Sequence, residues 1–289
     1  MPDILRAILL MVVGSFFFMV GDMFLKFSTE TLPLGLVTII LGTGMALVFL
    51  VMMLQRGHRI FDRAYLHYAM AMRCAGESIG VIGVILALTY SPFSTVTALM
   101  QSLPLVLTAM GVIFLGEKVG IHRILALFAG LIGVLIIIRP GLEGFDAFAT
   151  FTLLGVAGMA LRDFGTRIMP AAVSTTTLSF YGSLMIIVTG VGMMLITQDW
   201  TVPAGREIVF LTGLVTAAVI ATLAVATSMR LGDVSTIAPF RYVRIVFGVG
   251  AGIIVFGETV DLPTIIGSVI VVGAGLYSWM RERRLALNA

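Results

Sequence analysis

Residues 231–256 read LGDVSTIAPFRYVRIVFGVGAGIIVF, a stretch long and apolar enough to cross a bilayer that nevertheless carries Arg241 and Arg244. An arginine near the centre of a spanning helix costs about 2.5–3.5 kcal/mol on insertion-based scales. Two of them therefore need a compensating reason. Because they are three residues apart, they project from one broad face of the helix. We predict that this segment forms one wall of a polar cavity inside a membrane protein.

The composition makes the bilayer the solvent for most side chains. The chain is 59% hydrophobic and 11% charged, with a mean hydropathy of +1.11, whereas soluble domains have about 25% charged residues. The net charge of +3 is not gathered into a basic stripe, so a nucleic-acid partner is not expected. Cys74 is the single cysteine, which excludes a disulfide within the chain, and the histidines lack metal-ligand spacing. We expect neither a metal site nor a cofactor.

Hydropathy predicts an all-α integral membrane protein with ten transmembrane helices. A helix needs about 20 apolar residues to span the hydrocarbon core. By that criterion the segments lie near 5–26, 33–54, 65–88, 93–115, 119–138, 149–169, 175–197, 207–229, 234–256 and 262–280.

Basic residues in the loops predict the orientation, because cytoplasmic loops carry an excess of lysine and arginine. With the N-terminus in the cytoplasm, the outer side receives only Lys26, Arg139 and Arg206. The inner side then receives Arg6, Arg56, Arg59, Arg63, Lys118, Arg123, Arg167, Arg230, Arg281, Arg283 and Arg284. Both termini are therefore expected to be cytoplasmic.

The chain contains an internal repeat. A shift of 141 residues aligns Gly14 with Gly155 and Asp22 with Asp163, and the same shift aligns Gly116-Glu117 with Gly257-Glu258. The halves, 1–141 and 142–289, hold five spans each. An odd number of spans inserts the second half upside down relative to the first. This inverted arrangement is typical of secondary transporters, whose substrate site lies at the repeat interface near the midplane.

The fourth and ninth spans, which the repeat makes equivalent, each contain a proline. A proline removes the hydrogen bond to the carbonyl four residues back, so Pro104 and Pro239 would free the carbonyls of Met100 and Ser235. In a membrane such carbonyls need a partner or a wet cavity. A simple packing kink is the alternative.

The buried charges are the candidate substrate-binding residues. Arg241 and Arg244 can fork onto a carboxylate or phosphate of the substrate. The alternative is a structural ion pair with a buried acid, for which Glu77 in the third span is the obvious candidate. Arg73, one turn before Glu77, could instead pair with it locally.

Several polar side chains accompany these charges. Gln101 is the repeat equivalent of Tyr242, and the two would suit a cavity for a polar and aromatic ligand, so both are candidate binding residues. Asp22 and Asp163 each have a basic residue four positions later, which favours interfacial ion pairs. Glu117 and Glu258 follow glycines between two helices, where each is expected to cap the next helix.

Three motifs carry a resemblance to a known family. Phe-Leu-Gly-Glu at 114–117 and Val-Phe-Gly-Glu at 255–258 each precede a span rich in small residues, and Pro-Phe-Arg-Tyr occupies 239–242. The chain resembles the drug/metabolite transporter superfamily and, within it, the EamA-type family. The resemblance implies a secondary transporter of the bacterial inner membrane, with a cavity lined by the third, fourth, eighth and ninth spans. It implies members that carry amino acids, riboflavin, S-adenosylmethionine, sugars and other small metabolites.

The leading hypothesis is a transporter that moves an amino-acid-like or other anion-bearing metabolite by alternating access. Transport of a vitamin or nucleoside-type metabolite such as riboflavin or S-adenosylmethionine, or drug efflux, is the alternative. A membrane enzyme acting on lipid-linked substrates and a channel or scaffold are alternatives from other classes. The chain has no nucleotide-hydrolysing motif, so a gradient would drive transport. The partners are the small-molecule substrate and the bilayer, and a coupling proton on Glu77 and a homodimer stay open.

Overall fold

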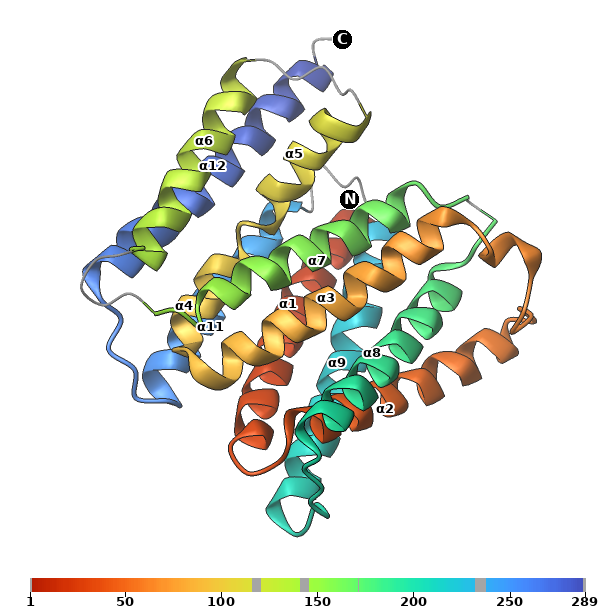
Figure 1. The fold of residues 1–289 in the computed structure, drawn as a ribbon. Helices are drawn as coiled ribbons and strands as arrows, with labels where there is room; N and C mark the ends of the chain where they lie inside the picture. Colours follow the sequence, from red (N-terminus) through yellow and green to blue (C-terminus); the bar gives the residue numbers. More distant parts are fainter. Residues whose placement is uncertain (1, 116–120, 141–145, 171, 232–237, 288–289) are drawn as a thin grey trace.

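A computed structural model describes residues 2–115, 121–140, 146–170, 172–231 and 238–287 (Figure 1). Within these ranges the regular elements are all helical. The helices are α1 (Pro2–Thr29), α2 (Leu34–Gln55), α3 (Tyr68–Tyr90), α4 (Phe93–Met100), α5 (Leu103–Leu115), α6 (Ile121–Ile138), α7 (Thr150–Arg167), α8 (Thr175–Thr197), α9 (Arg206–Leu231), α11 (Val243–Ile254) and α12 (Leu262–Leu287), with short 3₁₀ helices η1 (Arg63–Tyr65) and η2 (Ala238–Tyr242). In the described part of the chain, seven spans are long and apolar enough to cross a membrane.

The fourth predicted span is two helices rather than one. α4 ends at Met100 and α5 begins at Leu103, and the turn between them is closed by 3₁₀-type bonds such as Ser102 N to Leu99 O at 3.0 Å. Pro104 falls in the first turn of α5, where a missing N–H is tolerated. The described part of the ninth predicted span begins with the 3₁₀ helix η2, which carries Pro239 and leads directly into α11. The sequence places one continuous span at 93–115, so the break between Met100 and Leu103 is a finding of the structure. Ser235, whose carbonyl Pro239 would free, lies outside the described residues.

The helices pack as antiparallel pairs. α3 lies along α7, α1 along α9, α2 along α8, α6 along α12, and α4 along α11. The α3–α7 contact is backbone against backbone, because a methyl group on Gly83 would lie 2.2 Å from the nitrogen of Gly155. Small residues at such a contact let two spanning helices approach closely.

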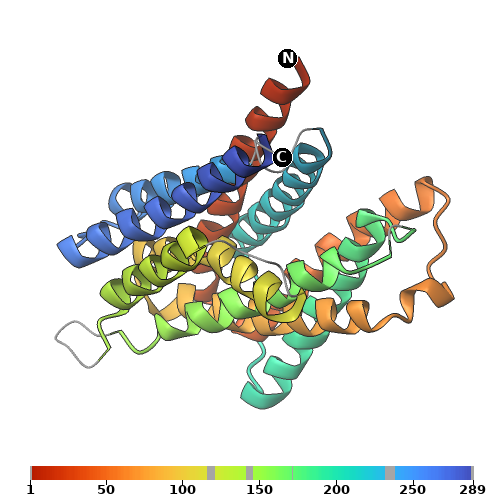
Figure 2. The same cartoon turned by 90° about the horizontal axis from the view of Figure 1, so that it is seen from above.

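The pairs at the edge of the molecule expose apolar side chains, as expected for contact with lipid. α6 and α12 lie on one side and α2 and α8 on the opposite side in both views (Figure 2). Phe128, Leu131 and Val269 on the first pair are 53–67% exposed. Between these edges, α1, α3, α7 and α11 surround the buried charges.

Candidate functional site

Charged side chains from five elements gather inside the helix bundle. We call this set the central charge cluster, and its members are Asp22 from α1, Arg73 and Glu77 from α3, Arg162 and Asp163 from α7, Arg241 from η2 and Arg244 from α11. Four guanidinium groups therefore face three carboxylates. Burying charges in a membrane is costly unless they are paired, so each partner has to be accounted for.

Glu77 lies between two arginines. One oxygen is 3.7 Å from Arg73 and the other is 3.5 Å from Arg162, so the predicted local pair with Arg73 is confirmed. Arg73 also donates to the carbonyl of Leu178 at 3.1 Å and to the hydroxyl of Thr166 at 2.9 Å. These bonds tie Arg73 to α8 and α7, and they give it a structural role beside its candidate role in binding.

Arg244 pairs with Asp22 and also lies over the ring of Phe18, at 5.3 Å from its centroid. The predicted partner Glu77 is therefore wrong. The predicted pair between Asp22 and Lys26 is wrong as well, because Lys26 donates to the carbonyl of Ser91 at 2.6 Å. A long lysine chain can extend toward the helix end, whereas Asp22 faces the bundle and needs a buried cation.

Asp163 pairs with its neighbour Arg162, whose Nε donates to it at 2.9 Å. The predicted pair with Arg167 is wrong for the same reason as that of Asp22, since the aspartate faces the interior of the bundle. Asp22 and Asp163 occupy equivalent positions of the repeat, and sequence reasoning had assigned both to the interface. Their position inside apolar spans was the signal that could have identified them.

Arg241 differs from the other three arginines. Among the residues that the structure describes, its guanidinium makes no hydrogen bond and no ion pair within 4.0 Å. The carboxylate of Asp163 attracts it electrostatically without forming an ion pair. A guanidinium without a hydrogen-bond or ion-pair partner among the described residues is a candidate to bind an anionic group of a ligand.

The two broken spans meet beside Arg241. Gln101, in the turn between α4 and α5, donates its amide to the carbonyl of Arg241 at 3.2 Å. Tyr242 points elsewhere: its ring lies against α12, where a methyl group on Gly275 would be 1.6 Å from the phenol oxygen. The structure thus brings Gln101 and Arg241 together and places Tyr242 in the packing against α12.

A second polar cluster joins the ends of α1, α4 and α11. Glu258 accepts hydrogen bonds from the backbone of Phe93, from the backbone of Ser94 at 2.9 Å and from the Ser94 hydroxyl at 2.7 Å. Lys26 lies 3.9 Å from the same carboxylate. Glu258 was expected to cap the next helix, which is α12. That expectation is wrong, because Glu258 caps α4, a helix in the other half of the chain. Glu117 lies outside the described residues.

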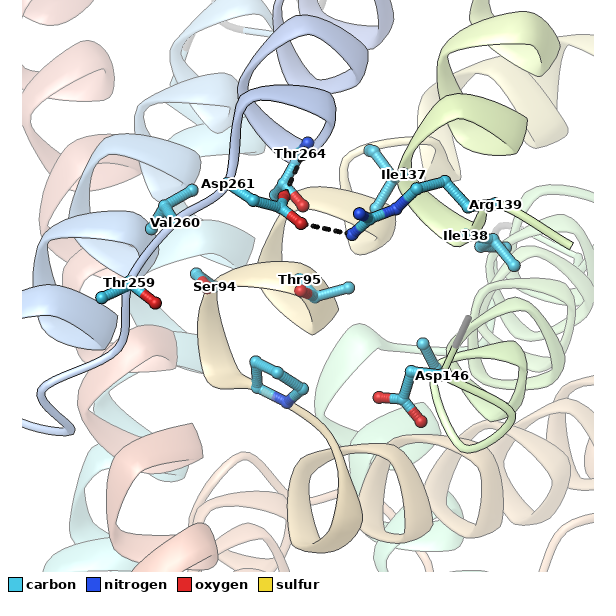
Figure 3. Close-up of a pocket in the computed structure, with 12 residues that line it drawn as sticks. Ser94, Thr95, Ile137, Ile138, Arg139, Asp146, Thr259, Val260, Asp261 and Thr264 are labelled. Carbon is cyan, nitrogen blue, oxygen red and sulfur yellow. Dashed lines mark hydrogen bonds and ion pairs between the residues drawn. The ribbon is translucent and has the colours of Figure 1, made fainter. Parts of the chain in front are cut away.

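A pocket of about 210 Å³ opens beside this second cluster (Figure 3). Its walls are the start of α4, the end of α6 and the start of α12, where Arg139 pairs with Asp261. Burial would raise the pKa of Asp261, but hydrogen bonds from Thr264 and Arg139 outweigh it and leave that pKa below its usual value. The lining includes Ser94 but no member of the central charge cluster.

A family model described as the EamA-like transporter family matches residues 5–139. An S-adenosylmethionine uptake transporter of Rickettsia felis is 26% identical over 68% of this chain and 66% of its own length, just under two thirds of that relative. A riboflavin transporter of Vibrio cholerae is 29% identical over 72% of this chain and 73% of its own. A pseudopaline exporter of Pseudomonas aeruginosa is 24% identical over 94% of this chain and 95% of its own.

A solved structure titled "Crystal structure of protein" has a TM-score of 0.66 with 17% sequence identity. It covers 96% of this chain, and this chain covers 98% of it. At that identity the likeness concerns the fold alone.

Proposed function

Residues 5–139 form an EamA-like transporter family domain, and from this premise we propose a bacterial inner-membrane secondary transporter that moves an acidic small metabolite by alternating access. The observation that carries the proposal is the guanidinium of Arg241, which has no partner among the residues that the structure describes and whose carbonyl accepts from Gln101 at the break between α4 and α5. An anionic group of the substrate would complete the charge balance of the central charge cluster, in which guanidiniums outnumber carboxylates by one.

The contacts of the described helices support an inverted repeat with halves 1–141 and 142–289. Gly14 packs on Val225, and their repeat equivalents, Gly155 and Val84, pack on each other. Gly42 lies against residue 183, which is its own equivalent in the repeat. A two-fold axis in the membrane plane produces this pattern, and substrate sites of such transporters lie at the repeat interface. Arg241 occupies that interface.

The names of the relatives narrow the substrate. S-adenosylmethionine carries an α-amino-acid group with a carboxylate, which matches an unpaired arginine, whereas riboflavin has no ionised acid at neutral pH. We therefore place amino-acid-derived metabolites such as S-adenosylmethionine first and riboflavin second. The carboxylate of the substrate would bind Arg241, and Glu77 or Asp163 would attract its ammonium group.

Binding tests the substrate class directly. Ligand at 100 times its dissociation constant stabilises a protein by about 2.7 kcal/mol, which raises the unfolding midpoint by roughly 5–10 °C for a chain of this size. We expect S-adenosylmethionine to do so and its decarboxylated analogue to have little effect. Equal stabilisation by both would remove Arg241 from the site.

Transport is tested in proteoliposomes. We expect saturable, gradient-dependent uptake that Arg241→Gln abolishes and that Arg59→Gln, in an exposed loop, leaves unchanged. Linear, unsaturable flux would instead indicate a channel. Conversion of a lipid-linked substrate without flux would indicate an enzyme. Reporter fusions to the two termini test the proposed orientation, in which both are cytoplasmic.

A further inference from the structure

Glu258 holds three helix ends together at the face of the molecule opposite the N-terminus of α1. We call its contacts the Glu258 latch, which consists of Lys26, Ser91, Phe93, Ser94 and Glu258. The side chains of Lys26 and Glu258 are only 16% and 14% exposed. The latch is thus a largely buried, charged contact in a place where the rest of the contact surface is apolar.

The Gly-Glu motif explains how the carboxylate reaches α4. Gly257 has φ +63°, a left-handed conformation that favours glycine. The N–H of Glu258 then bonds back to the carbonyl of Gly252 at 2.9 Å, which closes the end of α11. This turn directs the Glu258 side chain across to α4.

The carboxylate binds the first turn of α4, where free N–H groups and the helix dipole favour a negative charge. Aromatic rings from the same helix ends pack together: the Phe256 ring lies 5.1 Å from that of Phe93 and 5.1 Å from that of Phe27, between centroids. The Lys26 ammonium lies 5.3 Å from the centroid of Phe256. Because the side chains of Lys26 and Glu258 are largely shielded from water, their attraction is stronger than that of an exposed pair.

The helix that the latch holds is short and interrupted at its other end. α4 has 8 residues and stops at the turn that contains Gln101. Gln101 in turn donates to the carbonyl of Arg241. One short helix therefore contacts Glu258 at its outer end, and the turn at its inner end contacts Arg241, so the outer contact can separate while the turn keeps its position.

We propose that Glu258 is the positioning residue that keeps this end of the transport path closed, and that release of α4 from Glu258 opens it. The inference rests on the proposed alternating-access function. It assigns to the Gly-Glu motif a closing role between the two halves of the chain. When α4 swings outward at the turn beside Gln101, the latch separates while α5 stays in place.

Thiol labelling tests the latch without any substrate. Thr97, one turn inside the latch on α4, is 2% exposed, so Thr97→Cys reports opening once the single native cysteine is replaced by Cys74→Ala. We expect a membrane-impermeant thiol reagent to label the reporter about 5-fold faster when Glu258→Ala removes the helix cap, by the usual worth of such caps. Glu258→Gln, which keeps an acceptor but loses the charge, should give a smaller increase.

Glu207→Ala is the matched control. Glu207 also accepts a backbone N–H in front of a helix, from Ala204 at 3.0 Å, but it touches neither α4 nor α11. Its removal should leave the labelling rate unchanged. Unchanged labelling in both Glu258→Gln and Glu258→Ala would overturn the proposal, and so would an equal increase in the control. If Glu258→Ala fails to fold, Glu258→Gln decides alone.

The two proposals fail in different ways. If Glu258→Ala speeds labelling but the protein transports no solute, the proposed closing role of Glu258 is retained and the proposed transport function is refuted. Saturable transport with no change in labelling would refute the latch alone.

Discussion

The ion pair between Asp22 and Arg244 gives the sharpest test of the central charge cluster. The two side chains are 14% and 16% exposed, so removing one partner leaves the other as a buried, unpaired charge. We expect Arg244→Gln to lower the free energy of unfolding by about 3–5 kcal/mol for that reason. Asp22→Asn should lower it by a similar amount.

The double variant is the informative measurement. Replacing both partners by neutral residues removes the unpaired charge, and such replacements are often near neutral. Each kcal/mol moves the unfolding midpoint of a chain somewhat smaller than this one by about 2–4 °C. The single variants should therefore unfold roughly 6–20 °C below the wild type, whereas Asp22→Asn with Arg244→Gln should unfold within roughly 5 °C of it.

Thermal unfolding of the detergent-purified proteins at one fixed scan rate measures these differences, because membrane proteins often unfold irreversibly. Arg59→Gln serves as the control for loss of an arginine without loss of a buried pair. If the double variant lost as much stability as the two single variants together, the side chains would not be coupled. The assignment of Asp22 to Arg244 would then be refuted.

Three further predictions concern the packing and the loops. Gly83→Ala places a methyl group 2.2 Å from the nitrogen of Gly155, so it should lower the free energy of unfolding by about 1–3 kcal/mol or more. Gly192→Ala is the control, because nothing lies within 4 Å of its new methyl group, and it should leave the unfolding midpoint unchanged. Gly257→Ala forces φ +63° on an L-residue, which should lower stability by about 1–2 kcal/mol and speed labelling inside the latch. The pKa of Asp261 in the folded protein lies below its ordinary value. Ionised Asp261 therefore stabilises the folded protein at every pH above the ordinary aspartate pKa of about 3.9, and this stabilisation is lost as the pH falls through the lower pKa of the folded state. Asp261→Asn should therefore abolish that acid-side loss in a pH series of unfolding midpoints.

Seven of the ten predicted spans are long and apolar enough to cross a membrane in the described part of the chain, and these could be predicted because hydropathy and length are properties of single segments. The span predicted at 175–197 coincides with α8, Thr175–Thr197. The missing backbone donor at Pro104 predicts a local disturbance for an equally local reason, but the full break between α4 and α5 was not predicted.

The partners of the buried charges could not be predicted in the same way. Asp22 has Lys26 one turn away along the chain, yet its partner is Arg244, which is 222 residues distant in sequence. Glu258 precedes α12 but caps α4, because the turn at Gly257 directs it across the interface. The rule for residues four apart on a helix favours a partner on the same helix. The partner that is actually used depends on which side of the helix faces the interior of the bundle, and the sequence of one helix does not show that.

The shortness of α4 has a mechanical consequence. At about 1.5 Å per residue its length is about 12 Å, so a tilt of about 10° about the turn at Gln101 displaces the outer end by about 2 Å. That displacement carries the Ser94 bonds, now 2.7 and 2.9 Å long, beyond the ~3.5 Å limit of a hydrogen bond. The inner end of the same lever barely shifts. A tilt of about 10° in a helix of two turns is then enough to break the hydrogen bonds to the Glu258 carboxylate. This end of the protein can open without a large displacement of one half of the chain relative to the other.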